Sequence, residues 1–181
     1  MKTLSTLSTL AVLSLTAAAQ ALTIDLQFGT GSVSTPLAGG AEADSSSIVG
    51  VGIGTQLTDT SHLGINLSTR DIVVTDPGNP VNAKARTAIL EYTYELNPTG
   101  GIHPFIGAGI GYAWLKNTDG ATALASDVFA GLRFTVTESV DLTFTARAHQ
   151  LYNVDFNQGV QGEFNRQVNS FEAIAGLRFK F

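Results

Sequence analysis

The chain has 181 residues, a net charge of −5 and no cysteine. This length favours a single domain, and the absence of cysteine excludes a disulfide framework. The acidic balance argues against a nucleic acid as partner, because phosphate backbones bind basic surfaces.

Residues 1–21 have the pattern of a secretory signal peptide. Lys2 precedes a run rich in leucine and alanine, and Ala19 and Ala21 supply the small residues that surround a cleavage site. A membrane anchor is the weaker alternative, because the run is more polar and shorter than the ~20 apolar residues of a spanning helix. We therefore predict export, cleavage after Ala21 and one domain over residues 22–181. Loss of Lys2 changes the net charge from −5 to −6.

Eight segments of residues 22–181 alternate between apolar residues and polar residues or glycine. A period of two is the pattern of a β-strand with two different faces. The four longest segments have the ~9–11 residues that a tilted strand needs to cross a bilayer, and the others approach that length. No later stretch is apolar enough for a spanning helix, so residence in a membrane would depend on strands. The predicted strands are 22–28, 49–55, 63–68, 90–96, 106–114, 127–136, 140–149 and 171–181.

The predicted links between these strands are alternately short and long. Short turns are expected at 58–61, 97–101 and 137–139, and longer polar links at 30–44, 73–83, 116–122 and 150–169. Outer-membrane barrels have short periplasmic turns and longer outer loops. With an even number of strands, both termini are expected on the periplasmic side.

Alternation alone leaves two arrangements open: a soluble barrel with its apolar face inside, or a membrane barrel with that face outside. Glycine columns on the polar face, at 50–54 and 107–111, favour a narrow interior. A nearly balanced set of charges on the same face favours an interior too, because buried charges need partners. A one-residue slip would turn these charges toward lipid, where an arginine costs ~2–4 kcal/mol at the midplane. We predict a lumen charge network of Asp25, Arg70, Glu91, Glu95, Asp127, Arg133, Asp141, Arg147, Glu172, Arg178 and Lys180.

The apolar face is predicted to meet lipid and carries most of the aromatic side chains. Aromatic girdles lie at the two rims of a membrane barrel. The same pattern places Thr55 on the outer face, and Ile89, Phe105, Phe129 and Ile174 inside. The predicted outward aromatic residues are Tyr92, Tyr94, Tyr112, Trp114, Phe134, Phe171 and Phe181.

Three segments carry a resemblance to a known superfamily. They are 103–112 (HPFIGAGIGY), 137–142 (TESVDL) followed by Arg147, and the closing 176–181 (GLRFKF). Together they resemble the small eight-stranded outer-membrane proteins of the OmpA/OmpX-like and neisserial surface protein A-like group, and the Pro104 strand is also similar to the OmpW branch. The resemblance implies an all-β, eight-stranded antiparallel up-and-down transmembrane barrel, exported to the outer membrane of a Gram-negative cell. It also implies that Phe179 and Phe181 belong to the signal read by the barrel assembly machinery.

No catalytic, cofactor or metal site is predicted. The glycines at 50–54 and 107–111 lie inside strands, whereas a dinucleotide fingerprint needs a following helix. His62, His103 and His149 lack metal-ligand spacing. Lipid A deacylases, which are eight-stranded barrels, carry a His-x-Ser element, and no histidine here has serine two residues on. A serine and a histidine from distant strands remain the open alternative.

The 150–169 link is the predicted interaction surface. Tyr152, Phe156 and Phe164 lie there among amide side chains, a composition suited to binding. The equal alternative is that two strands continue beyond the membrane. Three functions are considered: a structural or surface-interaction role of the adhesin or opacity type, a narrow pore or small hydrophobic-ligand channel, and a lipid A-modifying enzyme. The first is favoured, with a monomer whose partners are outer-membrane lipid, the barrel assembly machinery and an extracellular ligand or host surface.

Overall fold

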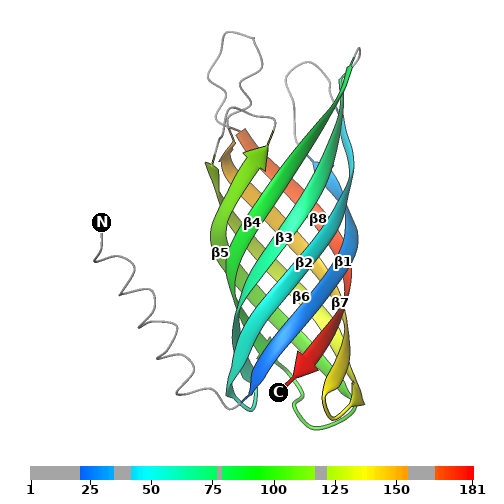
Figure 1. Ribbon diagram of the computed structural model, residues 1–181, viewed down its shortest axis with the longest axis vertical. Coiled ribbons are helices and arrows are strands. Elements are labelled where there is room, and N and C mark those ends of the chain that lie inside the picture. Colours follow the sequence, from blue (N-terminus) through cyan, green and yellow to red (C-terminus); the bar gives the residue numbers. More distant parts are fainter. Residues whose placement is uncertain (1–20, 35–41, 77–78, 117–121, 155–165) are drawn as a thin grey trace, which may run out of the picture.

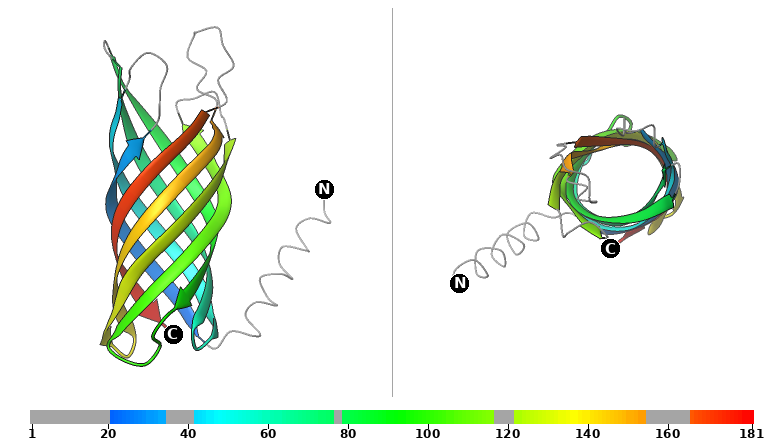
Figure 2. Two further views of the ribbon diagram at one scale, coloured as in Figure 1. Left: turned by 180° about the vertical axis from the view of Figure 1, so that it is seen from behind. Right: turned by 90° about the horizontal axis from the view of Figure 1, so that it is seen from above.

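The computed structural model describes residues 21–34, 42–76, 79–116, 122–154 and 166–181. Its strands follow one another in antiparallel order, and β1 also pairs with β8, so the sheet closes into a barrel (Figures 1 and 2). The predicted eight-stranded up-and-down barrel is confirmed. The strands are β1 (Leu22–Ser34), β2 (Glu42–Thr58), β3 (Ser61–Asp76), β4 (Asn79–Glu95), β5 (Ile102–Lys116), β6 (Thr122–Thr137), β7 (Val140–Val154) and β8 (Arg166–Lys180).

Short turns gather at one end of the barrel together with the C-terminus (Figure 1). The β4–β5 turn contains Gly100 at φ 142°, a conformation that favours glycine. At the same end the backbone N–H of Phe181 donates to the carbonyl of Leu22, at 3.0 Å. By the usual orientation of such barrels this is the periplasmic end, and the opposite end is the outer end. The predicted signal peptide lies outside the described residues, except for Ala21.

Three of the four predicted long links are shorter than expected, and the fourth, 116–122, agrees with the observed ends of β5 and β6. The 73–83 prediction is wrong: β3 continues to Asp76, β4 starts at Asn79, and these two residues pair in register. Likewise β7 runs to Val154 and β8 starts at Arg166, so both ends of the 150–169 link are strand. Beyond the membrane a strand needs no apolar face, so its residues there can be polar while its backbone pairing continues. The polar composition of these strand ends therefore resembled that of a loop.

The apolar face of the barrel points outward. Ile110, Leu132 and Phe144 are 58%, 42% and 48% exposed, respectively. The side chains of Arg133 and Glu91 are only 15% and 13% exposed. A continuous apolar belt of this kind suits a barrel surrounded by lipid, because soluble proteins rarely expose such an area.

Aromatic side chains lie on the belt at both rims. Tyr112 and Trp114 are exposed toward the outer end, and Tyr94 and Phe181 are exposed at the periplasmic end. Phe134 is half-buried, with its ring edge-on to Phe144 at 6.0 Å between centroids. Among the described residues, no helix has the length and apolar character needed to cross a bilayer.

Thr55 is an exception to the predicted outer face. It is 6% exposed, close to a register shift between Gln56 and Thr58. Its hydroxyl donates to the carbonyl of Ala21, at 3.2 Å. This hydrogen bond holds the side chain against the chain that enters β1, so the prediction that Thr55 faces lipid is wrong.

Candidate functional site in the barrel lumen

The lumen holds charged side chains in successive layers, and the first layer lies near the periplasmic end. Arg133 Nη2 is 2.5 Å from Glu95 Oε1, and Arg133 Nε is 3.4 Å from Asp141 Oδ2. Lys180 Nζ donates to the other oxygen of Asp141, at 2.8 Å. The side chain of Asp141 is 1% exposed, so two cations compensate one buried carboxylate.

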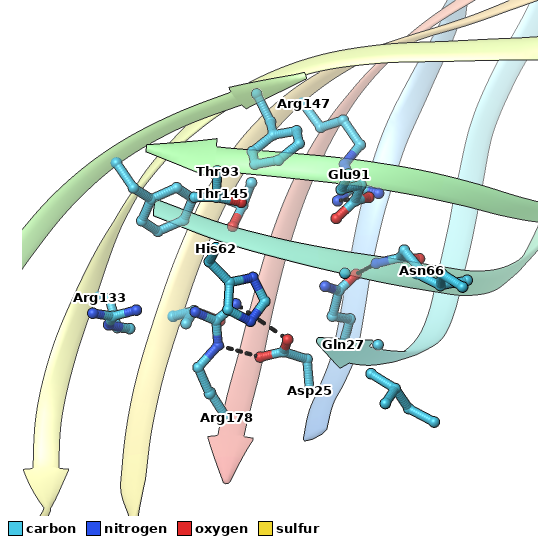
Figure 3. Close-up of a pocket in the computed structure, with 17 residues that line it drawn as sticks. Asp25, Gln27, His62, Asn66, Glu91, Thr93, Arg133, Thr145, Arg147 and Arg178 are labelled. Atoms are coloured by element: carbon cyan, nitrogen blue, oxygen red, sulfur yellow. Dashed lines mark hydrogen bonds and ion pairs between the residues drawn. The ribbon is translucent and has the colours of Figure 1, made fainter. Parts of the chain in front are cut away.

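The second layer joins the first and last strands. Arg178 donates to Asp25 through Nε at 2.7 Å and through Nη2 at 3.1 Å. Figure 3 shows this forked pair beside His62. A bidentate pair fixes both side chains, because two parallel hydrogen bonds constrain their geometry. The pair therefore stabilises the β1–β8 closure from inside.

Arg147 is the centre of the third layer. Its Nη2 is 2.9 Å from Glu91 Oε1, and its Nη1 is 3.5 Å from Asp127 Oδ2. The guanidinium carbon lies 5.2 Å from the centre of the Phe129 ring, within the range of a cation–π contact. Phe129 also packs edge-on against Phe105, at 6.3 Å between centroids. Charge and aromatic surface together fill the middle of the lumen.

The fourth layer is the most deeply buried. Arg70 donates to Glu172 at 2.6 Å and 3.1 Å, and to the hydroxyls of Ser68 and Thr87, at 2.7 Å each. The side chains of Arg70 and Glu172 are 2% and 0% exposed. Ser170 donates to Glu172 at 3.2 Å. All three nitrogen atoms of the Arg70 guanidinium therefore donate hydrogen bonds, as a buried ion pair requires. The structure thus places all eleven residues of the predicted lumen charge network inside the barrel and joins them in ion pairs.

A small cavity lies between the second and third layers. It has a volume of about 40 Å³, and its lining includes Asp25, His62, Asn66, Glu91 and Arg147 (Figure 3). At ~10–15 Å³ for each water, this space admits roughly three water molecules. It is far smaller than the ~300–1,000 Å³ of pockets that hold drug-sized ligands.

Glycine keeps the charged interior free of steric overlap. A Cβ at Gly109 would lie 2.5 Å from Ile89 Cγ2 and 2.6 Å from Asp127 Oδ1. The absence of that atom leaves room for the inward side chains of the neighbouring strands.

Toward the outer end the interior becomes apolar, beginning with Ile89 between the third and fourth layers. Residues from the outer parts of β1, β4, β5, β6, β7 and β8 form one buried cluster. We call this the outer apolar cluster: Val33, Ala85, Ile89, Ala113, Leu115, Ala123, Ala125, Leu151 and Val168. The sequence predictions did not include it as a unit. One signal in the sequence could have revealed it: near the outer end the apolar residues change from the outward to the inward positions. Val33 and Leu151 face inward and are apolar, whereas their outward neighbours Ser32 and Gln150 are polar.

The histidines all lie inside the barrel wall. His62 is hydrogen-bonded to Thr23 at 2.7 Å, and His103 lies 3.1 Å from the carbonyl of Asn97. His149 is 3% exposed, and neither ring nitrogen has a hydrogen-bond partner among the described residues. No group of three or more potential ligands in the described part of the chain could hold a metal ion.

Two further predicted site residues, Tyr152 and Phe181, lie outside the lumen. Tyr152 is half-buried in β7, with its hydroxyl close to Ser126 and to the side-chain oxygen of Gln150. Phe156 and Phe164 lie outside the described residues. At the end of β8, Phe181 is 73% exposed on the outer surface of the barrel.

Comparison with known proteins supports the fold. No protein-family model and no curated protein matches the chain. The chain is similar to the crystal structure of neisserial surface protein A, with a TM-score of 0.68 and 18% identity over 89% of this chain and 99% of the other. It is also similar to OprG from Pseudomonas aeruginosa, with a TM-score of 0.62 and 16% identity over 91% and 97%. The outer membrane enzyme PagL matches with a TM-score of 0.57 and 17% identity over 84% and 97%.

These likenesses define the class of protein. The chain has the fold of the small eight-stranded outer-membrane β-barrels. The exposed apolar belt is the surface such a barrel presents to lipid. Fold and surface together are those of an integral membrane β-barrel.

Proposed function

We propose that this protein is a non-conducting outer-membrane barrel with a structural or surface-interaction role, of the adhesin or opacity type. The observation that carries the proposal is the occupied lumen. Four layers of ion pairs fill the interior, and the outer apolar cluster lies toward its outer end. A lumen filled in this way leaves the outer surface as the part that can meet a partner.

The long β3–β4 hairpin supports a role at the cell surface. Its backbone pairing continues five residues beyond the outward-facing Asp71, to Asp76. Figure 1 shows β3 and β4 extending beyond their neighbours at the outer end. Paired strands present their edge with little loss of conformational entropy on binding, which favours recognition of an extracellular ligand or host surface. The protein acts as a monomer, inserted by the barrel assembly machinery through Phe179 and Phe181.

Conductance in planar bilayers tests the sealed lumen. The refolded protein should insert without discrete current steps, and its folding is checked by the change in gel mobility on boiling. Reproducible single-channel steps from the folded protein would contradict the proposal.

Shortening the β3–β4 hairpin tests the surface role. Cells that display a variant lacking residues 74–81 should bind less to host-cell layers than cells with the intact chain, at equal surface amounts. Equal binding by both would reject this hairpin as the interaction surface. A variant lacking Pro98 and Thr99 in the longer β4–β5 turn, at the periplasmic end, is the matched control.

A small hydrophobic-ligand channel is the second candidate, and the outer apolar cluster favours it. The same cluster also opposes it, since its members are at most 7% exposed and the cavity beneath holds only about 40 Å³. Uptake of a fluorescent alkane derivative by expressing cells distinguishes the two. We expect no increase over cells without the protein.

We also propose that the protein is not an enzyme. A lipid-modifying centre would need a base on the lipid-facing wall, whereas His62, His103 and His149 are all buried inside. The likeness to PagL is one of fold. Mass spectra of lipid A should be unchanged when the protein is overexpressed, and a new deacylated species would overturn this expectation.

A further inference from the structure

A basic patch lies on the outer wall of the barrel, at the outer edge of the apolar belt. Along the outward face of β4, apolar Leu90 and Ala88 are followed by Arg86 and Lys84. On β3 the same change occurs between Leu67 and Thr69. Arg86, the cation next to the apolar belt, therefore lies at the level where the acyl chains end and the lipid headgroups begin.

Arg86 differs from the other described cations. Every other lysine or arginine whose side chain is described has an ion pair with a carboxylate. Arg86 is exposed and makes no ion pair or hydrogen bond with any described residue. This occurs in a chain whose net charge is −5, so the unpaired guanidinium is not part of a generally basic surface.

The neighbours of Arg86 extend the patch. Lys84 Nζ lies 3.0 Å from Asp71 Oδ1, and the two side chains are 44% and 54% exposed. The backbone register pairs Lys84 with Lys116 and Arg86 with Trp114. Trp114 is 47% exposed, just inside the edge of the belt. Arg86 thus lies beside an interfacial aromatic residue on the neighbouring strand.

We propose that Arg86 and Lys84 bind the phosphate of a phosphorylated glycolipid in the outer leaflet. An arginine guanidinium forms forked, charge-assisted hydrogen bonds with phosphate oxygens, and an adjacent lysine adds a second charge. The acyl chains of the same lipid lie along the belt beside Tyr112 and Trp114, since the two parts of the patch face the same side of the wall. One lipid molecule then supplies both the phosphate that contacts Arg86 and the acyl chains that contact the belt. This inference is independent of the role proposed above for the hairpins.

Trp114, the single tryptophan of the chain, reports on the patch directly. The folded protein in an uncharged maltoside detergent is titrated with dansyl-labelled lipid A carrying its phosphates, and with the same lipid after dephosphorylation. Energy transfer from Trp114 measures binding. We expect the phosphorylated lipid to bind about tenfold more tightly, the effect of one charge-assisted hydrogen-bonded contact. Equal affinity of the two lipids would overturn the proposal.

Three variants separate phosphate binding from general effects on the barrel. Arg86→Gln with Lys84→Gln should abolish the preference for the phosphorylated lipid. Asp71→Asn should strengthen binding of that lipid, because it removes the carboxylate that neutralises Lys84. Ser32→Gln, at an exposed outward position of β1, is the matched control and should change neither affinity. A preference retained by the double variant, or weakened by Asp71→Asn, would contradict the inference.

Free phosphate distinguishes a lipid site from a site for a soluble anion. Inorganic phosphate at millimolar concentration should displace little of the labelled lipid, because it lacks the chain contacts with the belt. Full displacement at that concentration would show that the patch recognises soluble phosphate and would reject the lipid assignment.

Discussion

Arg70 and Glu172 form one of the two most deeply buried ion pairs in the lumen. Glu172→Gln would leave the Arg70 guanidinium without its counter-charge, at 2% exposure. Breaking a buried pair from one side costs about 3–5 kcal/mol, and we expect this loss in the free energy of unfolding. Urea unfolding of the protein in lipid vesicles measures it. The exposed pair supplies the control: Asp71→Asn should cost less than about 1 kcal/mol. Similar losses for both variants would contradict the importance of burial.

Gly131 shows how closely backbone and side chains approach inside the wall. A Cβ there would overlap the carbonyl oxygen of Phe144 and lie 2.5 Å from the ring of Phe105. Gly131→Ala should therefore destabilise the barrel by about 1–3 kcal/mol, the usual effect of overpacking. At Gly101 nothing lies within 4 Å of the added atom, so Gly101→Ala should leave stability almost unchanged. Equal midpoints of unfolding for the two variants would show that the wall adapts to the extra atom.

The sequence predicted which charged residues share the inner face, but not the partner of each. Arg147 and Glu172 are neighbours in register on β7 and β8. Nevertheless, Arg147 pairs with Glu91 of β4, and Glu172 pairs with Arg70 of β3. These pairs cross the lumen, so they depend on the tilt and stagger of the closed sheet. Alternation along one strand contains no information on either.

At the scale of the strand, alternation identified each crossing segment but not where it ends. The lipid requires an apolar outer face only over the crossing itself, and beyond it the outward residues become polar. The extension of β3 and β4 to Asp76 and Asn79 is maintained by backbone pairing, which a polar composition does not reveal. The outer apolar cluster was missed for the same reason, since it lies where the outer face is no longer apolar.

Position along one strand should decide how strongly a charge on the outer wall destabilises the protein. Ala175 and Asn169 both face outward on β8, in the middle of the belt and beyond its outer edge, respectively. Ala175→Arg should lower the free energy of unfolding by ~2–4 kcal/mol, and Asn169→Arg by ~0–1 kcal/mol. Unfolding in vesicles of fixed chain length measures both. A larger loss at Asn169 would mean that the belt extends beyond Phe171.

At the scale of the whole molecule, one sheet separates two environments. Its outer face is apolar between two polar rims, and its inner face changes from paired charges to a buried apolar cluster. The closed order of the strands leaves no free sheet edge among the described residues, so the backbone is satisfied without water. The overall arrangement was predictable because lipid outside and charge inside both impose a period of two.

The orientation of the two faces is the central claim, and the chain contains no cysteine to interfere with its test. Single cysteines are introduced along β7 at Phe144 and Ala146, which face outward, and at Thr143 and Thr145, which line the lumen cavity. The folded protein in vesicles is exposed to an apolar maleimide dissolved in the lipid and, separately, to a charged thiol reagent in the water. We predict that the lipid-dissolved reagent labels the two outward positions and neither inward position, and that the charged reagent leaves the outward positions unmodified. Labelling of Thr143→Cys and Thr145→Cys from the lipid, with Phe144→Cys and Ala146→Cys open to the charged reagent, would contradict the account.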